Sequence, residues 1–117
     1  MLTFYEYPRC STCRKAKAEL KKLGLTFEAI DIKKTPPKAE QLKSWLETGP
    51  FNLKSYFNTS GNSYRQLGLK DTFSSLSTDE ALKLLAADGM LLKRPILTEN
   101  GRILQIGYRT PYAELGL

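Results

Sequence analysis

The chain changes between strand-like and helix-like patterns of hydrophobic and polar residues. Residues 2–7 and 26–32 are rich in β-branched and aromatic residues, which is typical of strands. Between them, apolar residues recur at helical spacing: Cys13, Ala16, Leu20 and Leu23. The spacing predicts a helix over residues 11–23, with Gly24 placed to end it in a left-handed conformation. Strand, helix and strand make a βαβ unit, so we expect the two strands to be parallel.

The middle of the chain, about residues 35–90, is predicted to be an all-helical insert. Thr35-Pro36-Pro37 has the pattern of a cap followed by proline in a first helical turn, and Gly49-Pro50 would stop that helix. Ser77 with Glu80 forms a capping box that opens a helix to about residue 88. Two shorter helical segments are expected between these helices, around residues 53–57 and 64–67.

The last segment returns to strands. Residues 95–99 and 102–106 flank Asn100-Gly101, a dipeptide that suits the type I′ turn of a β-hairpin. Thr110-Pro111 is then expected to cap a short last helix that carries Tyr112 and Leu115. The pattern predicts one α/β domain over residues 1–117, in which a βαβ unit and a C-terminal hairpin form a mixed sheet.

The Cys10-Ser11-Thr12-Cys13 motif falls between the first strand and the first helix. Unpaired N–H groups and the helix dipole favour an anion at Cys10, so its thiol is the candidate nucleophile. Cys13 shares the buried helix face and is the candidate resolving thiol, although a small core residue is the alternative. A Cys-x-x-Cys motif in this position predicts a thioredoxin-like core.

Arg94-Pro95 is a second candidate site segment, since a proline is tolerated where a strand opens. Thioredoxin-like folds place a cis proline here, against the cysteine loop. Arg94 would then hold an anion beside Cys10 through its planar set of donors. The alternative is a surface arginine that precedes a strand.

Charge and composition narrow the candidate functions. The chain carries 18 Lys and Arg against 12 Asp and Glu, a net charge of +6, which attracts oxyanions, glutathione and acidic protein surfaces. No nucleic-acid reading motif accompanies this charge, so direct nucleic-acid binding is not expected. The sequence has no histidine, which excludes Cys-His catalysis and leaves the cysteine pair without the usual further zinc ligands. No signal-peptide pattern or membrane-length apolar run is present, which predicts a cytoplasmic protein with no membrane partner.

With these motifs placed, the sequence resembles the ArsC/Spx family of glutaredoxin-coupled arsenate reductases and Spx redox-responsive regulators. The resemblance covers essentially the whole chain. It rests on four segments in order: Tyr7-x-x-Cys10-x-x-Cys13-Arg14-Lys15-Ala16, Gly61-x-x-Tyr64-Arg65-x-Leu67, Asp88-Gly89-x-Leu91, and Lys93-Arg94-Pro95-Ile96-Leu97 followed by Gly107-Tyr108. It implies a thioredoxin-like core with a helical insert.

The arsenate-reductase branch implies a set of site residues. Its catalytic cysteine is matched by Cys10, and one of its three oxyanion-binding arginines is matched by Arg94. Ser60 stands near the position of a second arginine, and Arg109 is an unaligned stand-in for the third. We expect Cys10, Cys13 and Arg94 to be catalytic and a further group to contact substrate: Ser11, Thr12, Pro95 and Arg109.

The presence of a second cysteine, Cys13, resembles the Spx branch instead, which carries the same Cys-x-x-Cys motif. Those regulators bind the C-terminal domain of the RNA polymerase α subunit, partly through a glycine near position 52 and a basic tail. Here position 52 is Asn52 and the sequence ends at Leu117 without such a tail.

Three hypotheses therefore stand. The first is a thiol oxidoreductase acting on a small oxyanion or a disulfide, with glutathione, a glutaredoxin or a thioredoxin as reductant and no bound metal or cofactor. The second is a redox-switched regulator that binds a protein such as the polymerase α subunit. The third gives both cysteines a purely structural role.

Overall fold

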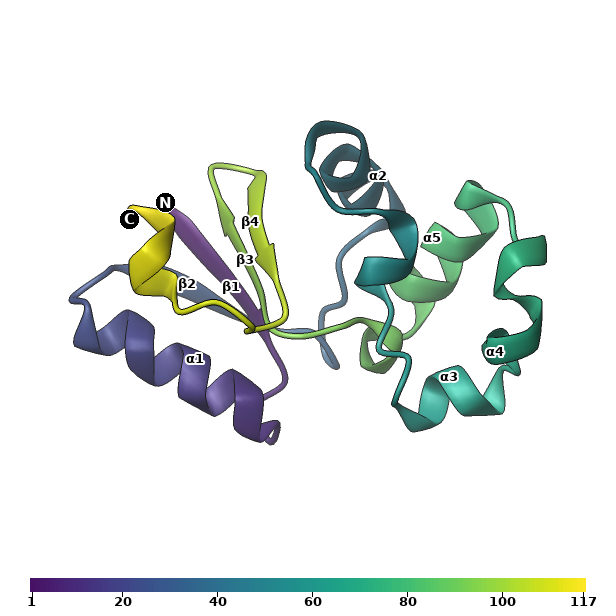
Figure 1. Ribbon diagram of the computed structural model, residues 1–117, viewed down its shortest axis with the longest axis horizontal. Coiled ribbons are helices and arrows are strands. Elements are labelled where there is room, and N and C mark those ends of the chain that lie inside the picture. The colour runs from purple at the N-terminus through teal and green to yellow at the C-terminus, as the bar shows by residue number, and fades with distance from the viewer. The chain divides into compact units, whose positions relative to one another are not determined.

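Strands from the N-terminal and C-terminal segments of the chain form one four-stranded mixed sheet in the order β2-β1-β3-β4 (Figure 1). In the computed structural model, which describes residues 1–117, β1 (Leu2–Glu6) pairs parallel with β2 (Phe27–Asp31). β3 (Ile96–Glu99) runs antiparallel to β1, and β4 (Arg102–Ile106) antiparallel to β3. The predicted parallel βαβ unit and the C-terminal hairpin are both confirmed.

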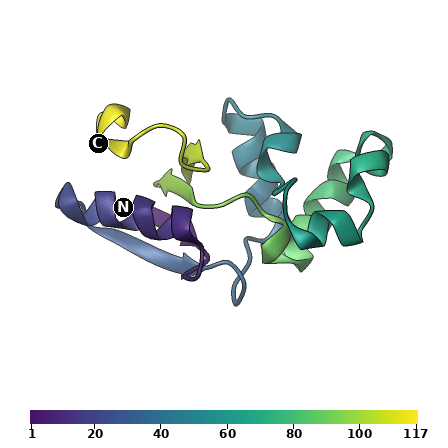
Figure 2. The ribbon, with the colours of Figure 1, turned by 60° about the horizontal axis from the view of Figure 1, so that its bottom comes forward.

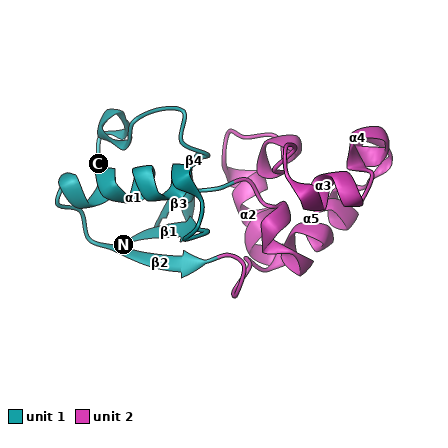
Figure 3. Cartoon of the chain, turned by 90° about the horizontal axis from the view of Figure 1, so that it is seen from below, with its two compact units in different colours: residues 1–31, 94–117 teal, residues 32–93 magenta.

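The chain divides into two compact units, which Figure 3 distinguishes by colour. Unit 1 comprises residues 1–31 and 94–117 and contains the whole sheet. Unit 2 comprises residues 32–93, contains the stretch predicted as a helical insert, and is built of helices. No helix in either unit is long and apolar enough to span a bilayer.

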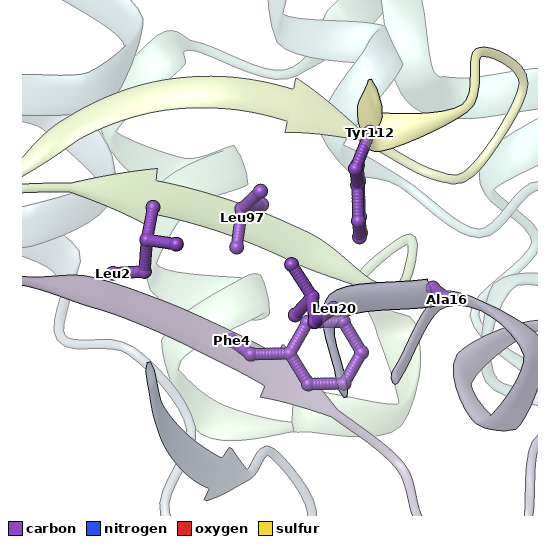
Figure 4. Close-up of a cluster of buried hydrophobic side chains, with 6 residues drawn as sticks. All are labelled: Leu2, Phe4, Ala16, Leu20, Leu97 and Tyr112. Atoms are coloured by element: carbon purple, nitrogen blue, oxygen red, sulfur yellow. The ribbon is translucent and has the colours of Figure 1, made fainter. Parts of the chain in front are cut away.

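In unit 1, α1 (Ser11–Lys22) and the short 3-10 helix η4 (Tyr112–Leu115) share a core with the central strands. Figure 2 shows α1 running alongside β2. The six buried side chains of this core appear in Figure 4: Leu2, Phe4, Ala16, Leu20, Leu97 and Tyr112. Because α1 packs through this apolar face, its N-terminus is held at the end of β1.

Two turns of unit 1 follow their sequence signals. Gly24 adopts φ +71° after α1, and the N–H groups of Gly24 and Leu25 bond back to the last helical turn. Asn100 (φ 50°) and Gly101 (φ 83°) both have positive φ, as a type I′ turn requires. The hairpin register shifts by one residue between Leu97 and Thr98, which marks a β-bulge.

Unit 2 packs α2 (Ala39–Thr48) against α5 (Thr78–Ala87). The side chains buried on these two helices are Leu42, Trp45, Ala81, Leu82 and Leu85. The other elements are η1 (Leu53–Tyr56), α3 (Asn62–Gln66), α4 (Leu69–Thr72), η2 (Phe73–Ser75) and η3 (Gly89–Leu91). The sequence patterns had not indicated α4, η2 and η3, which are each one turn long and lack a full period of apolar residues.

Of the two long helices of unit 2, one has the N-terminal cap that the sequence predicted and the other does not. The predicted capping box of α5 is present, with the Glu80 N–H donating to Ser77 Oγ (3.1 Å) and the Ser77 N–H to Glu80 Oε1 (2.9 Å). The expected cap at Thr35 is wrong, because α2 begins at Ala39 with Lys38 at its N-cap. A residue that precedes proline avoids the helical region, so Pro36 and Pro37 keep the chain out of the helix at this point.

At Gly89 the backbone passes close to that of Ile32. A Cβ at this position would lie 1.8 Å from the carbonyl oxygen of Ile32, so no side chain fits without a shift of the backbone. The segment around η3 is further held by backbone hydrogen bonds from Asn58 N–H to Leu91 O and from Lys93 N–H to Tyr56 O, each 2.8 Å.

Candidate functional site

A tight turn carries the chain from β1 into α1 and places Cys10 at the helix N-cap. The Cys10 N–H donates to the Tyr7 carbonyl (2.9 Å), and the Cys10 carbonyl accepts the Arg14 N–H (3.0 Å), which starts the helical hydrogen bonds. Arg14 Nε also donates to the Pro8 carbonyl at 2.9 Å. Cys10 is extended (φ −77°, ψ 124°) and partly exposed, so its thiol lies in front of the first helical turn and in reach of solvent.

The surroundings of the Cys10 thiol favour its ionised form. Partial burial by itself would raise the pKa, but hydrogen bonds outweigh it and hold the pKa below the ordinary 9.0. The N–H groups of Cys13 and Thr12, the Cys13 thiol and the Arg94 guanidinium all act in this direction. As a neutral thiol the side chain forms no capping hydrogen bond, so these donors become effective once the sulfur carries charge.

Cys13 has the opposite environment. Its side chain is fully buried on the core face of α1, and this burial, more than any other factor, raises its pKa to about 12. The neighbouring Cys10 thiolate raises the pKa further, by its charge and by accepting the Cys13 S–H. The Tyr7 N–H and the charge of Arg94 act against this rise. Both cysteines are free, so the site holds one thiol with a lowered pKa next to one with a raised pKa.

Arg94 reaches this site from the segment just before β3. Its guanidinium lies 5.5 Å from the centroid of the Tyr7 ring, a cation–π contact that positions it beside the cysteine loop. The Arg94–Pro95 peptide bond is cis, as the sequence predicted, and the Pro95 carbonyl accepts the Gly107 N–H at 2.8 Å. The strands thus bring residues 10, 13 and 94 together.

The other predicted substrate-contacting residues are placed differently. Ser11 and Thr12 are exposed in the first turn of α1, and the Thr12 N–H contributes to the Cys10 site. Arg109 is exposed on the loop after β4, where its backbone N–H donates to Gln105 Oε1 (3.1 Å). The groups that act on the Cys10 thiol are Arg94, Thr12 and Cys13. A role for Arg109 in binding substrate therefore stays a prediction.

Outside the predicted set of site residues, Tyr7 supports the cysteine site and Glu19 supports η4. Tyr7 contributes its ring to Arg94 and its N–H to Cys13, and its position directly before the cysteine turn is the signal that points to it. Glu19 of α1 accepts hydrogen bonds from the Tyr108 hydroxyl (2.6 Å) and from the N–H groups of Tyr112 (2.6 Å) and Ala113 (3.0 Å).

Glu19 therefore caps η4 from a distant part of the chain. The predicted local cap is wrong, because η4 has Pro111 at its N-cap and no side-chain cap of its own. Burial would raise the pKa of the Glu19 carboxyl, but its three donors outweigh burial and lower it. Nothing in the local sequence pairs residue 19 with residues 112 and 113, so only the tertiary fold reveals this contact.

Ser60 and Asn52, which differ from the residues that the family resemblance implies at these positions, both lie in unit 2. Ser60 is exposed in the turn before α3. Asn52 is the N-cap of η1, where its Oδ1 accepts the Ser55 N–H (3.0 Å) and hydroxyl (2.8 Å). A glycine at this position would lack the side-chain oxygen that accepts these two hydrogen bonds.

Fold and site together define a thioredoxin-like domain with a cysteine pair at the N-terminus of its first helix. Residues 5–112 match the family model described as the ArsC family, and the chain belongs to that family. It is 49% identical over 108 residues to the uncharacterized protein YusI of Bacillus subtilis, covering 92% of this chain and 91% of that protein.

The chain is also similar to proteins with two different descriptions. The chain is 31% identical over 108 residues to the global transcriptional regulator Spx of Lactiplantibacillus plantarum, covering 92% of this chain and 80% of the regulator. The crystal structure of a possible arsenate reductase from Streptococcus mutans matches with a TM-score of 0.96 and 62% identity, covering 100% of this chain and 98% of that one. The chain is therefore similar both to a transcriptional regulator and to a protein described as a possible arsenate reductase.

Proposed function

We propose that the protein is a thiol-dependent oxidoreductase in which Cys10 is the nucleophile and Cys13 the resolving thiol. The observation that carries the proposal is the pairing of the two sulfurs. The pKa of Cys10 is lowered while that of Cys13 is raised to about 12, and the Cys13 S–H donates to the Cys10 thiolate. This asymmetry suits a two-step exchange with an exposed attacker and a sheltered resolver.

In the first step, the Cys10 thiolate attacks one sulfur of a substrate disulfide. A Cys10–substrate disulfide bond forms, the substrate's own bond breaks, and its other sulfur leaves as a thiolate. Arg94, already in contact with the Cys10 sulfur, stabilises the negative charge in this region. A small oxyanion is the second substrate class suited to this arginine and to the basic chain.

In the second step, Cys13 releases its proton to solvent, and the resulting thiolate attacks the Cys10 sulfur. An intramolecular disulfide forms and the substrate leaves as its second thiolate, so two protein thiols are oxidised as one disulfide is reduced. Once Cys10 is bound covalently, its negative charge no longer opposes ionisation of Cys13. The Tyr7 N–H and the charge of Arg94 then favour the Cys13 thiolate.

The cycle requires a reductant that returns the pair to two thiols. We propose glutathione, a glutaredoxin or a thioredoxin, each of which supplies thiols for the reverse exchange. A reducing cytoplasm would keep the resting protein in this dithiol state.

Trapping of the intermediate tests the proposal. Cys13→Ser removes the resolving thiol, so exposure to oxidised glutathione should leave a stable glutathione adduct on Cys10, read by intact-mass and peptide mass spectrometry. Wild type should pass on to the internal disulfide with release of glutathione. Absence of any Cys10 adduct in Cys13→Ser, with no internal disulfide in wild type, would refute the oxidoreductase.

A redox-switched regulator is the second candidate, favoured by the similarity to Spx over most of this chain. In that case the Cys10–Cys13 disulfide would alter a surface that binds a partner such as the RNA polymerase α C-terminal domain. A pull-down with this domain, with and without oxidant, distinguishes the two functions. Oxidant-dependent binding that Cys10→Ser abolishes, in a protein that reduces no disulfide or arsenate with glutathione, would favour the regulator.

A further inference from the structure

A basic pocket lies within unit 2, apart from the cysteine pair in the sequence. Its five lining residues are Lys54, Thr59, Tyr64, Arg65 and Lys70, and its volume is about 350 Å³. This volume is near the lower end of the range typical of small-molecule sites, which runs from roughly 300 to 1,000 Å³. The hollow is therefore large enough for a compact ligand.

The three cations of the basic pocket come from three different elements. Lys54 belongs to η1, Arg65 to α3 and Lys70 to α4. Arg65 is oriented by a hydrogen bond from its Nη2 to Asn62 Oδ1. Lys54 Nζ lies 5.8 Å from the centroid of the Phe73 ring. Tertiary packing, not one charged helix face, brings these cations to the same hollow.

The charge of the basic pocket is not balanced by acidic groups. No Asp or Glu lines it, and the ion pair between Lys17 and Glu6 lies in unit 1. Three like charges around one hollow repel each other, and a bound anion converts that repulsion into attraction. The hydroxyl of Thr59 adds a neutral donor to the lining.

A second pocket of unit 2 offers a contrast. It is smaller, about 180 Å³, and it is lined by Lys43 and Lys83 together with Glu40 and Asp79. Its lysines thus share their hollow with carboxylates, whereas those of the basic pocket do not. Lysine content alone does not distinguish the two pockets, but their net charge does.

We propose that the basic pocket binds a compact polyanion, a small molecule with phosphate or clustered carboxylate groups. Arg65 offers a planar set of donors for an oxyanion, and Lys54 and Lys70 supply charge from the neighbouring walls. The inference is independent of the thiol chemistry, because it uses no residue of the cysteine site.

Binding of pyrophosphate and of citrate tests this site in the full chain. Backbone amide NMR shifts should change saturably around residues 54, 59, 65 and 70, with affinities read by calorimetry at constant ionic strength. Stronger binding of pyrophosphate would identify the phosphate class, and stronger binding of citrate the carboxylate class. Shifts spread over lysines throughout the chain, or no saturation at millimolar concentration, would overturn the proposal.

Matched charge removal supplies the control. Lys54→Gln with Lys70→Gln should weaken binding of the preferred anion about tenfold, since two charged donors are lost. Lys43→Gln with Lys83→Gln removes the same net charge from the other pocket and should change the affinity less than about twofold. Circular dichroism checks that both variants fold. Equal weakening by the two pairs would show attraction to net charge alone and would overturn the site.

Discussion

Selective alkylation of the two cysteines is the most direct prediction from the thiol site. Iodoacetamide reacts with thiolates, so the rate at each cysteine reports how much of its thiol is ionised and how far it is exposed. We expect Cys10 to be modified much faster than Cys13 in the folded protein at pH 7.

The expected ratio follows from the two pKa values. With a pKa of about 12, Cys13 is roughly 10⁻⁵ thiolate at pH 7, whereas Cys10, whose pKa lies below 9.0, is more than about 1% thiolate. The population ratio is therefore at least about 1,000. A more basic thiolate is also the better nucleophile. At a Brønsted slope of about 0.45, the Cys13 thiolate is intrinsically roughly 20 to 30 times more reactive than the Cys10 thiolate, which reduces the expected rate ratio by that factor. The net preference is at least about 30-fold, before the full burial of Cys13 is counted.

Each cysteine is assayed in a variant that lacks the other, because alkylation of one cysteine changes the pKa of its neighbour. Cys10 is measured in Cys13→Ser and Cys13 in Cys10→Ser, by mass spectrometry under pseudo-first-order conditions. Removal of Cys10 lowers the pKa of Cys13, but burial remains the main cause of its rise. The rate at Cys10 should increase with pH and level off above its pKa, which the N–H groups of residues 12 and 13 and the Arg94 side chain still lower after the Cys13 thiol is removed.

Full unfolding in urea is the internal control, since both thiols then have ordinary pKa values and should react at similar rates. Equal rates in the folded variants would refute the assignment of nucleophile and resolver. So would faster reaction at Cys13.

Three further predictions concern positions that support the site and the fold. Arg94→Gln should raise the pKa of Cys10 and slow its alkylation several-fold at pH 7, because the guanidinium no longer stabilises the thiolate. Glu19→Ala should lower the free energy of unfolding by about 2 kcal/mol in urea titrations at pH 7, since η4 loses its cap. Because the folded pKa of Glu19 is depressed, its contribution is complete above the unfolded value of 4.5 and is lost as pH falls through the folded pKa. Gly89→Ala should cost about 3 kcal/mol or more in the same titration, because the new methyl group would overlap the Ile32 carbonyl.

Matched variants give each of these predictions a baseline. Arg109→Gln removes an exposed cation of unit 1 and should leave the Cys10 alkylation rate nearly unchanged, so an equal effect would contradict the role of Arg94. Glu47→Ala, on an exposed helix position, should change stability by less than about 0.5 kcal/mol. If Glu19→Ala costs no more than Glu47→Ala, the distant cap is unimportant. Gly68→Ala meets no neighbouring atom but is strained by its positive φ, so it separates backbone strain from the steric overlap at Gly89; an equal cost at both would contradict the overlap argument.

The sequence by itself determined the features that depend on short stretches of chain. The βαβ pattern, the Asn100-Gly101 hairpin and the capping box at Ser77 all arise from neighbouring residues, so periodicity and turn chemistry suffice to predict them. The position of Cys10 at a helix start could likewise be predicted from the residues next to it in the sequence. Local rules failed where one-turn helices lacked a full apolar period and where consecutive prolines delayed the start of α2.

Only the tertiary structure decided which distant side chains meet. Arg94 contacts the Cys10 sulfur because β3 pairs with β1, and Glu19 caps η4 because both pack on the same core. The burial that separates the two thiol pKa values also depends on that core, since α1 must lie on the sheet before Cys13 leaves solvent. The sequence places two cysteines on one helical turn, and the fold makes them unequal because desolvation and hydrogen bonding exist only after packing.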